Sequence, residues 1–357
     1  MEQQKNLFKL AGITFSISIF TSLVIRFVLI ALKPTLQVNF EDYNVLMIIQ
    51  MIFHILSILL PTLLAIAIIK PSRATLGIKF CGFRNLFLAI PIGLFAIPVV
   101  ACANGLFLIL IKSIFGKISY TGMPTPENIE QLLIGILCVA VYPALSEELA
   151  FRGLMLAGLR QRFSLRPAIL LCGTFFAMNH FSIQVVAGIL LIGVLYSYVT
   201  WKTGSILPAI IMHFINNAVS ELLSYFSSST APQSKNAAIQ TISQIFDFAN
   251  QNWFVFLIQL ITILLILAFS IFVCLLCIHF LKKTRLAPEA APETAPETAP
   301  ETAPETAPET SLETSPENTP VEVPVENAKR LPGMGWFIPG IVFILIIYVF
   351  EILSLMN

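Results

Sequence analysis

The chain has 357 residues, of which 57% are hydrophobic and 11% are charged, and its formal net charge is +1. This balance is typical of polytopic membrane proteins and excludes a soluble domain of any size. We expect membrane lipids to surround the chain, and we expect no nucleic acid partner.

Apolar runs near or above membrane-spanning length follow one another along the sequence. They cover residues 10–32, 45–69, 86–111, 131–159, 167–181, 183–201, 205–226, 253–281 and 336–355. We therefore predict an all-α fold, a polytopic membrane helical bundle with eight transmembrane helices in the core plus a tethered C-terminal hydrophobic helix. Most Lys and Arg residues then face the cytoplasm if the N-terminus is cytoplasmic, which favours this orientation in a bacterial plasma membrane.

Two polar residues interrupt the first runs. Arg26 and His54 each stand alone on an otherwise apolar helix. A lone ionisable group of this kind is more often interfacial or satisfied by neighbours than part of a site. We therefore interpret both residues as parts of a scaffold.

The fourth run carries an unusual group of charges, Glu147, Glu148 and Arg152. Ionisable groups at membrane depth are costly, so they usually face a cavity or one another and mark function. Neighbouring helix positions point about 100° apart, whereas Glu148 and Arg152 are four residues apart and share a face. We predict that these two residues pair and leave Glu147 free to act. The alternative is that all three lie past the helix end, in the headgroup region.

Two histidine motifs follow on later runs. His180 ends the fifth run, and His213 shares a helix face with Asn217 within the seventh. At about 1.5 Å per residue, the two histidines and Glu147 lie at similar depth, near the middle of the membrane. Pro143, one turn before Glu147, is expected to open the helix there and admit water.

The sequence divides into three regions. Residues 1–285 are expected to form the membrane-embedded helical body, with its catalytic core at about 131–225. Residues 286–330 repeat Ala-Pro-Glu-Thr and cannot bury a core, so we expect a disordered acidic linker rich in Pro, Glu and Thr. Residues 331–357 are expected to form a C-terminal transmembrane helix.

A carboxylate, two imidazoles and an amide in one wet cavity suit the hydrolysis of an amide bond. The carboxylate can activate water as a base, and the donors can stabilise a tetrahedral oxyanion. No serine or cysteine is paired with a base in the sequence, so we favour attack by water. The same side chains could also hold a metal.

The order of the three motifs resembles the CAAX protease and bacteriocin-processing (CPBP) family of intramembrane endopeptidases. The motifs are Glu-Glu-x-x-x-Arg, Phe-x-x-x-His and His-x-x-x-Asn, and Thr203-Gly204-Ser205-Ile206-Leu207-Pro208-Ala209 precedes the last of them. The resemblance covers about residues 131–225. The acidic linker and the last apolar run have no counterpart in it.

The resemblance implies roles for individual residues. Glu147 would be the general base, and His180 would help to hold the attacking water. His213 and Asn217 would form the oxyanion site. The full set implied to be catalytic is Glu147, Glu148, Arg152, His180, His213 and Asn217. Family members are often called metalloproteases, and a bound divalent metal, which these ligand types suggest would be zinc, would be held by Glu147, His180 and His213.

The resemblance implies an intramembrane endopeptidase that cuts membrane-embedded or lipid-modified peptides or proteins. Its setting would be CAAX-type proteolysis, bacteriocin processing or self-immunity. The alternative is a non-catalytic membrane immunity or scaffolding protein that binds a partner through the same cavity. A transporter would show an inverted repeat with broken helices, and the sequence has no such symmetry.

Overall fold

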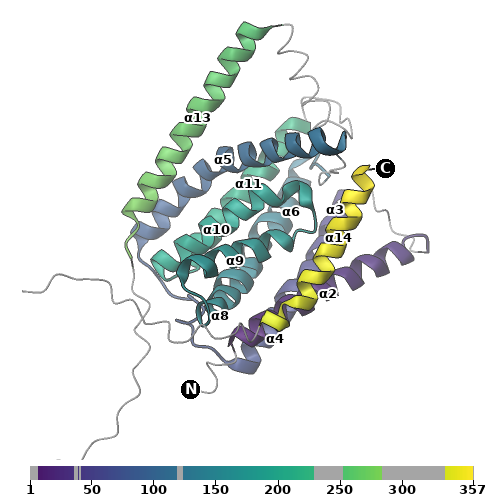
Figure 1. Cartoon of the computed structure of the whole chain (residues 1–357), viewed down its shortest axis with the longest axis vertical. Coiled ribbons are helices and arrows are strands. Elements are labelled where there is room, and N and C mark those ends of the chain that lie inside the picture. Colours follow the sequence, from purple (N-terminus) through teal and green to yellow (C-terminus); the bar gives the residue numbers. More distant parts are fainter. Residues whose placement is uncertain are drawn as a thin grey trace, which may run out of the picture. The chain divides into compact units, whose positions relative to one another are not determined.

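The computed structural model describes residues 7–35, 39, 42–118, 124–228, 252–283 and 334–356. Its regular elements within these ranges are all helical (Figure 1), which confirms the all-α fold. The elements are α2 (Leu7–Leu32), α3 (Tyr43–His54), η1 (Ile55–Leu59), α4 (Leu60–Ile69), α5 (Phe83–Phe115), α6 (Ile129–Gly135), η2 (Ile136–Val141), α7 (Tyr142–Glu148), η3 (Leu149–Met155), α8 (Leu156–Arg160), α9 (Leu165–Met178), η4 (Ile183–Val185), α10 (Val186–Thr203), α11 (Leu207–Ser228), α13 (Trp253–Phe280), η5 (Met334–Trp336) and α14 (Ile338–Met356). The linker expected at 286–330 lies outside the described residues.

Within the described residues, 7 helices are long and apolar enough to span a membrane. They are Leu7–Leu32, Tyr43–Ile69, Phe83–Phe115, Ile129–Arg160, Ile183–Thr203, Trp253–Phe280 and Ile338–Met356. Two expected core spans are missing from this set: α9 has only 14 residues, and α11 carries a histidine, two asparagines and a glutamate. The polytopic membrane bundle is therefore confirmed, whereas the expected number of eight core helices is approximate.

Two spans change their helical winding next to the sequence motifs. In Tyr43–Ile69 the π-helical segment η1 begins directly after His54, and in Ile129–Arg160 two π-helical segments flank α7. Such segments are rare and occur frequently at functional sites. Pro143 lies at the start of α7, directly after η2, so the winding is irregular where the proline predicts it.

Close helix crossings position the helices that carry the motifs. Helix α5 contacts α10, α11 and α13 (Figure 1). At Gly93 of α5, a Cβ atom would lie 3.0 Å from the Cα of Met212 in α11. At Gly193 of α10, a Cβ atom would lie 2.9 Å from the Cα of Gly173 in α9. Small residues at such crossings let helix backbones approach closely in membranes, so these glycines fix how near the motif-bearing helices can come.

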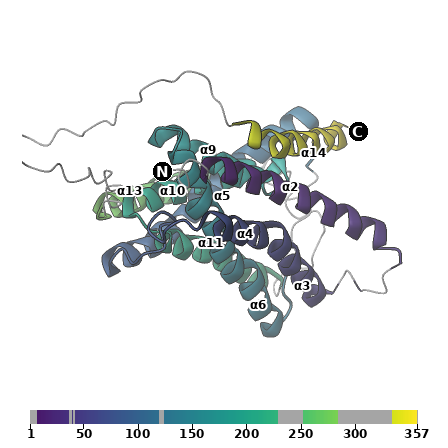
Figure 2. The same cartoon turned by 90° about the horizontal axis from the view of Figure 1, so that it is seen from below.

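The C-terminal helix α14 lies along α2 (Figures 1 and 2). Phe337, just before α14, is fully buried and stacks on Phe175 of α9 with ring centroids 5.0 Å apart. Ser16 of α2 donates a hydrogen bond from Oγ to the carbonyl of Trp336 at 2.7 Å. At Gly12 a Cβ atom would lie within 2.9 Å of Trp336 and Phe337, so only glycine permits this contact. The helix expected to follow a linker therefore packs on the first helix of the body.

Candidate active site

The first motif lies in the interior of the span Ile129–Arg160. Glu147 and Glu148 end α7, and Arg152 lies in η3. Their exposed fractions are 3%, 0% and 2%. This burial in the middle of a continuous helical span is inconsistent with a headgroup position past the helix end.

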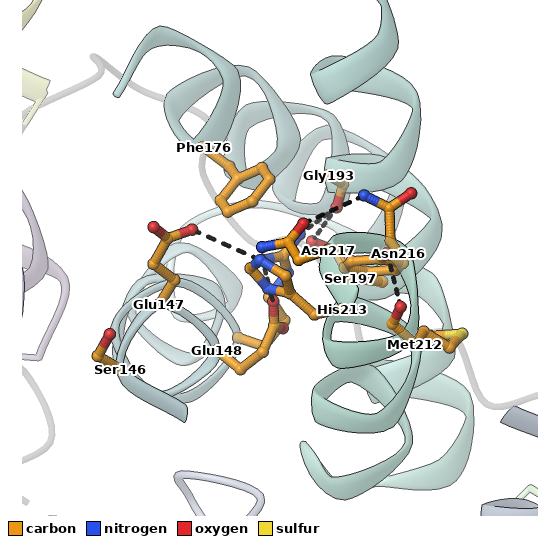
Figure 3. Close-up of polar contacts among 12 residues, drawn as sticks. Ser146, Glu147, Glu148, Phe176, Gly193, Ser197, Met212, His213, Asn216 and Asn217 are labelled. Carbon is orange, nitrogen blue, oxygen red and sulfur yellow. Dashed lines mark hydrogen bonds and ion pairs between the residues drawn. The ribbon is translucent and has the colours of Figure 1, made fainter. Parts of the chain in front are cut away.

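Glu148 has two charged or polar partners. Nη1 of Arg152 donates to Oε1 of Glu148 at 2.8 Å, which confirms the pair predicted from their spacing. Nδ1 of His213 lies 2.7 Å from the same oxygen (Figure 3). Because a carboxylate only accepts hydrogen bonds, Nδ1 carries the hydrogen and the ring is held with Nε2 facing away.

Arg152 is supported on its other side by α10 and α9. Its Nη2 donates to the carbonyl of Gly193 at 3.1 Å, and its guanidinium lies over the ring of Phe176 at 4.2 Å. The ring of Tyr196 is also within 5.3 Å. An arginine can be buried when hydrogen-bond acceptors and aromatic faces replace water in this way. Sequence reasoning missed Gly193 and Tyr196, because neither lies in a motif.

Glu147 points away from Glu148, toward two imidazoles. Its Oε2 lies 3.9 Å from Nε2 of His213 (Figure 3), and its Oε1 lies 3.4 Å from Nδ1 of His54. Oε2 of Glu147 is buried and has no hydrogen-bond partner among the described residues. Oε2 of Glu148 also has no hydrogen-bond partner among the described residues, but Glu148 is paired with Arg152, whereas Glu147 faces only the two imidazoles.

His54 belongs to this site, so its interpretation as a scaffold residue is wrong. It ends α3, its side chain is 12% exposed, and Nδ1 faces Glu147. Arg26 lies near the same part of the structure. Its guanidinium is 5.0 Å from the rings of both Phe53 and Phe181, which adjoin His54 and His180 in sequence. The depth of His54 within its run is the sequence signal that could have grouped it with the other two histidines.

His180 follows α9 and contacts Phe176, one turn earlier in the chain. Its Nδ1 lies 3.0 Å from the carbonyl of Phe176, and its ring meets the Phe176 ring edge-on at 5.1 Å. With the hydrogen on Nδ1 given to that carbonyl, Nε2 is the acceptor. The ring of Phe176 also meets the ring of His213 edge-on at 5.9 Å, so the two histidines adjoin the same aromatic side chain.

Asn217 lies one turn after His213 on α11, on the same face. Its Nδ2 donates to the carbonyl of Val139 in η2 at 2.8 Å, and Asn216 donates to its Oδ1 at 3.3 Å (Figure 3). The structure thus gathers Glu147, Glu148, Arg152, His180 and His213, and it places Asn217 at the edge of this group. One amide hydrogen of Asn217 remains for another acceptor.

The same residues include side chains of the kinds that bind metals. The donor types suit zinc, and imidazoles bonded through Nδ1 to a carboxylate or carbonyl are typical of metal ligands. However, no group of three or more His, Cys, Asp or Glu side chains in the described part of the chain is placed to hold a metal ion. The ligand set Glu147, His180 and His213 therefore stays a prediction, and no step below uses a metal.

Residues 129–219 match the family model described as "Type II CAAX prenyl endopeptidase Rce1-like". The matched segment contains all three motifs, so the resemblance to CAAX-type proteases is confirmed for this part of the chain. Searches of curated proteins and of solved structures found no match. The protein is therefore an integral membrane protein whose central helices are similar to a family of membrane proteases.

We expect Glu148→Gln to destabilise the protein, because it leaves the buried Arg152 without a compensating charge. Removing one partner of a buried pair costs about 3–5 kcal/mol. The thermal unfolding temperature and the yield of monodisperse protein should both fall. Glu130→Gln, the same change at an exposed position of α6, is the control and should alter neither. Equal unfolding temperatures for the two variants would contradict the structural role of the pair.

Proposed function

We propose that the protein is an intramembrane endopeptidase that hydrolyses peptide bonds of membrane-associated or lipid-modified substrates with water activated by Glu147. The position of Glu147 carries this proposal. It is a buried carboxylate that is not paired with Arg152, it lies between two imidazoles, and it is within the segment similar to CAAX prenyl endopeptidases. A carboxylate held at membrane depth without a charged partner of its own is costly unless it has a function.

Glu147 acts as the base in this proposal. Its carboxylate takes a proton from water as the oxygen attacks the scissile carbonyl carbon, and the proton then passes to the leaving amine. His180 presents Nε2 as an acceptor, so it can hold the second hydrogen of the same water. The attack thus needs no nucleophilic side chain.

His213 and Asn217 stabilise the oxyanion. When both ring nitrogens of His213 are protonated, Nδ1 still donates to Glu148 and Nε2 becomes a donor toward the site. The unused amide hydrogen of Asn217, one turn away, is the second donor. Glu148 and Arg152 orient His213 and touch no substrate in this scheme.

The proposal leaves three physiological settings open. CAAX-type proteolysis, bacteriocin processing and self-immunity would all use this chemistry, and the distribution of basic residues favours a cytoplasmic N-terminus in a bacterial plasma membrane. A different class of function is a non-catalytic immunity or scaffolding protein that binds its partner in the same cavity. That function requires the shape of the site but not a base.

Glu147→Gln separates the two classes. Glutamine keeps the size and hydrogen-bonding shape but cannot take up a proton, so cleavage of a farnesylated CAAX peptide should fall by at least about 100-fold. Glu130→Gln serves again as the control and should retain wild-type cleavage. If the Glu147→Gln protein, present at normal levels, still fully replaced the wild-type protein in cells, the hydrolytic function would fail. The binding function would then be the better proposal.

His54→Phe tests whether the second histidine beside Glu147 takes part. Phenylalanine preserves the ring but removes the nitrogen that faces Oε1 of Glu147, so we expect kcat to fall by about 10-fold or more. His279→Phe, the same change at an exposed position of α13, should have no effect. Wild-type kcat in His54→Phe would show that its contact with the base is not used.

Chelation tests the metal question directly. Because the described ligands are not placed as a metal site, we expect cleavage to persist after treatment with a zinc chelator, and elemental analysis to find less than one metal per chain. Loss of cleavage that is restored by added zinc would instead assign Glu147, His180 and His213 as ligands. Each of their alanine variants should then lose the metal as well.

A further inference from the structure

Helix α14 contains one carboxylate, Glu351, in an otherwise apolar sequence. An ionisable group in such a helix is costly, and its partners indicate why it is kept. The partners of Glu351 lie in the short segment that joins α9 to α10, directly after His180. The matched segment 129–219 contains this turn but not α14.

Both oxygens of Glu351 are used. Oε1 accepts from Oγ of Ser182 at 2.7 Å and from Nε2 of Gln184 at 2.8 Å, and Oε2 accepts from the backbone N–H of Ile183 at 2.6 Å. Hydrogen bonds to a charged acceptor are shorter and stronger than neutral ones. Glu351 therefore fixes three successive residues at the start of the span Ile183–Thr203.

The turn that Glu351 fixes is conformationally unfavourable by itself. Phe181, between His180 and Ser182, has φ of 55°, in the left-handed region that non-glycine residues rarely adopt. Such a conformation persists only when the surroundings determine it. Here the ring of Phe181 lies under Arg26 on one side, and Glu351 holds the following three residues on the other.

We propose that Glu351 is a positioning residue for His180. By holding the turn after His180, the C-terminal helix keeps this histidine against Phe176, the residue whose ring also meets His213, although α14 lies outside the segment similar to known proteases. The part of the proposal that concerns the turn rests only on the hydrogen bonds of Glu351. Its consequence for cleavage rests on the function proposed above.

The anchoring of α14 does not depend on Glu351. Its first turn is held on α2 by Ser16, whose Oγ accepts from the N–H of Gly340 at 3.2 Å, and by the buried Phe337. These contacts lie at the other end of the helix. Replacing Glu351 should therefore release the turn without detaching α14.

The test uses full-length Glu351→Ala and Glu351→Gln, with Tyr348→Phe as the control. Tyr348 lies one turn earlier on α14, and its buried hydroxyl has no hydrogen-bond partner among the described residues, so its removal breaks no bond. Hydrogen exchange of the amides in residues 181–185 should rise by at least about 10-fold in Glu351→Ala, less in Glu351→Gln, and not in Tyr348→Phe. Unchanged exchange in Glu351→Ala would overturn the proposal, and Glu351→Gln decides the question if the alanine variant does not accumulate.

Cleavage of the farnesylated CAAX peptide gives the second readout. We expect kcat of Glu351→Ala to fall by about 10-fold or more with little change in KM, because the water-holding group is misplaced while the binding surface remains. Faster exchange with wild-type kcat would overturn the role of Glu351 in catalysis. If the wild type itself cleaved no peptide, the proposed function would fail, and the exchange experiment would still decide whether Glu351 holds the turn.

Discussion

The arrangement of the site depends on the buried pair of Glu148 and Arg152. Removing two charges from water is costly, and their attraction repays this only when further hydrogen bonds satisfy both groups. Here the carbonyl of Gly193, two aromatic rings and the imidazole of His213 supply most of those contacts, and Oε2 of Glu148 and Nε of Arg152 have no hydrogen-bond partner among the described residues. Because the pair occupies Glu148, and because neighbouring helix positions point in different directions, Glu147 faces His54 and His213 instead of Arg152. The paired carboxylate and the carboxylate that we propose as the base are thus adjacent in sequence but have different partners.

This division of roles requires that helices distant in sequence approach closely. Gly173 and Gly193 bring α9 and α10 together so that the backbone of α10 can reach Arg152, and Gly93 brings α5 against α11 beside His213. Side chains at these crossings would push apart the groups that they align. The chemistry of the motif residues therefore rests on positions where a side chain is absent.

The sequence predicted what depends on local spacing. The apolar runs predicted an all-α membrane bundle, and the four-residue separation predicted the pair of Glu148 and Arg152. It did not predict the place of His54, because an apolar helix in a membrane has no polar face that shows which side meets the protein. The sequence also did not predict the packing of α14 or the contacts of Glu351, because their partners lie more than 160 residues away in the chain. Which helices become neighbours is decided by tertiary packing, and hydropathy carries little information about it.

Three ionisable side chains outside the motifs make contacts close to the site. Arg26 lies between aromatic residues next to His54 and His180, and Glu351 holds the turn after His180. Glu221 of α11 accepts a hydrogen bond from the hydroxyl of Tyr43 in α3 at 3.2 Å, and so joins the helices that carry His213 and His54. Polar contacts between membrane helices act in this way because hydrocarbon offers no competing partner. Each of these residues therefore contacts an element that carries or adjoins a histidine of the site, and the surroundings of the site extend beyond the segment that resembles known proteases.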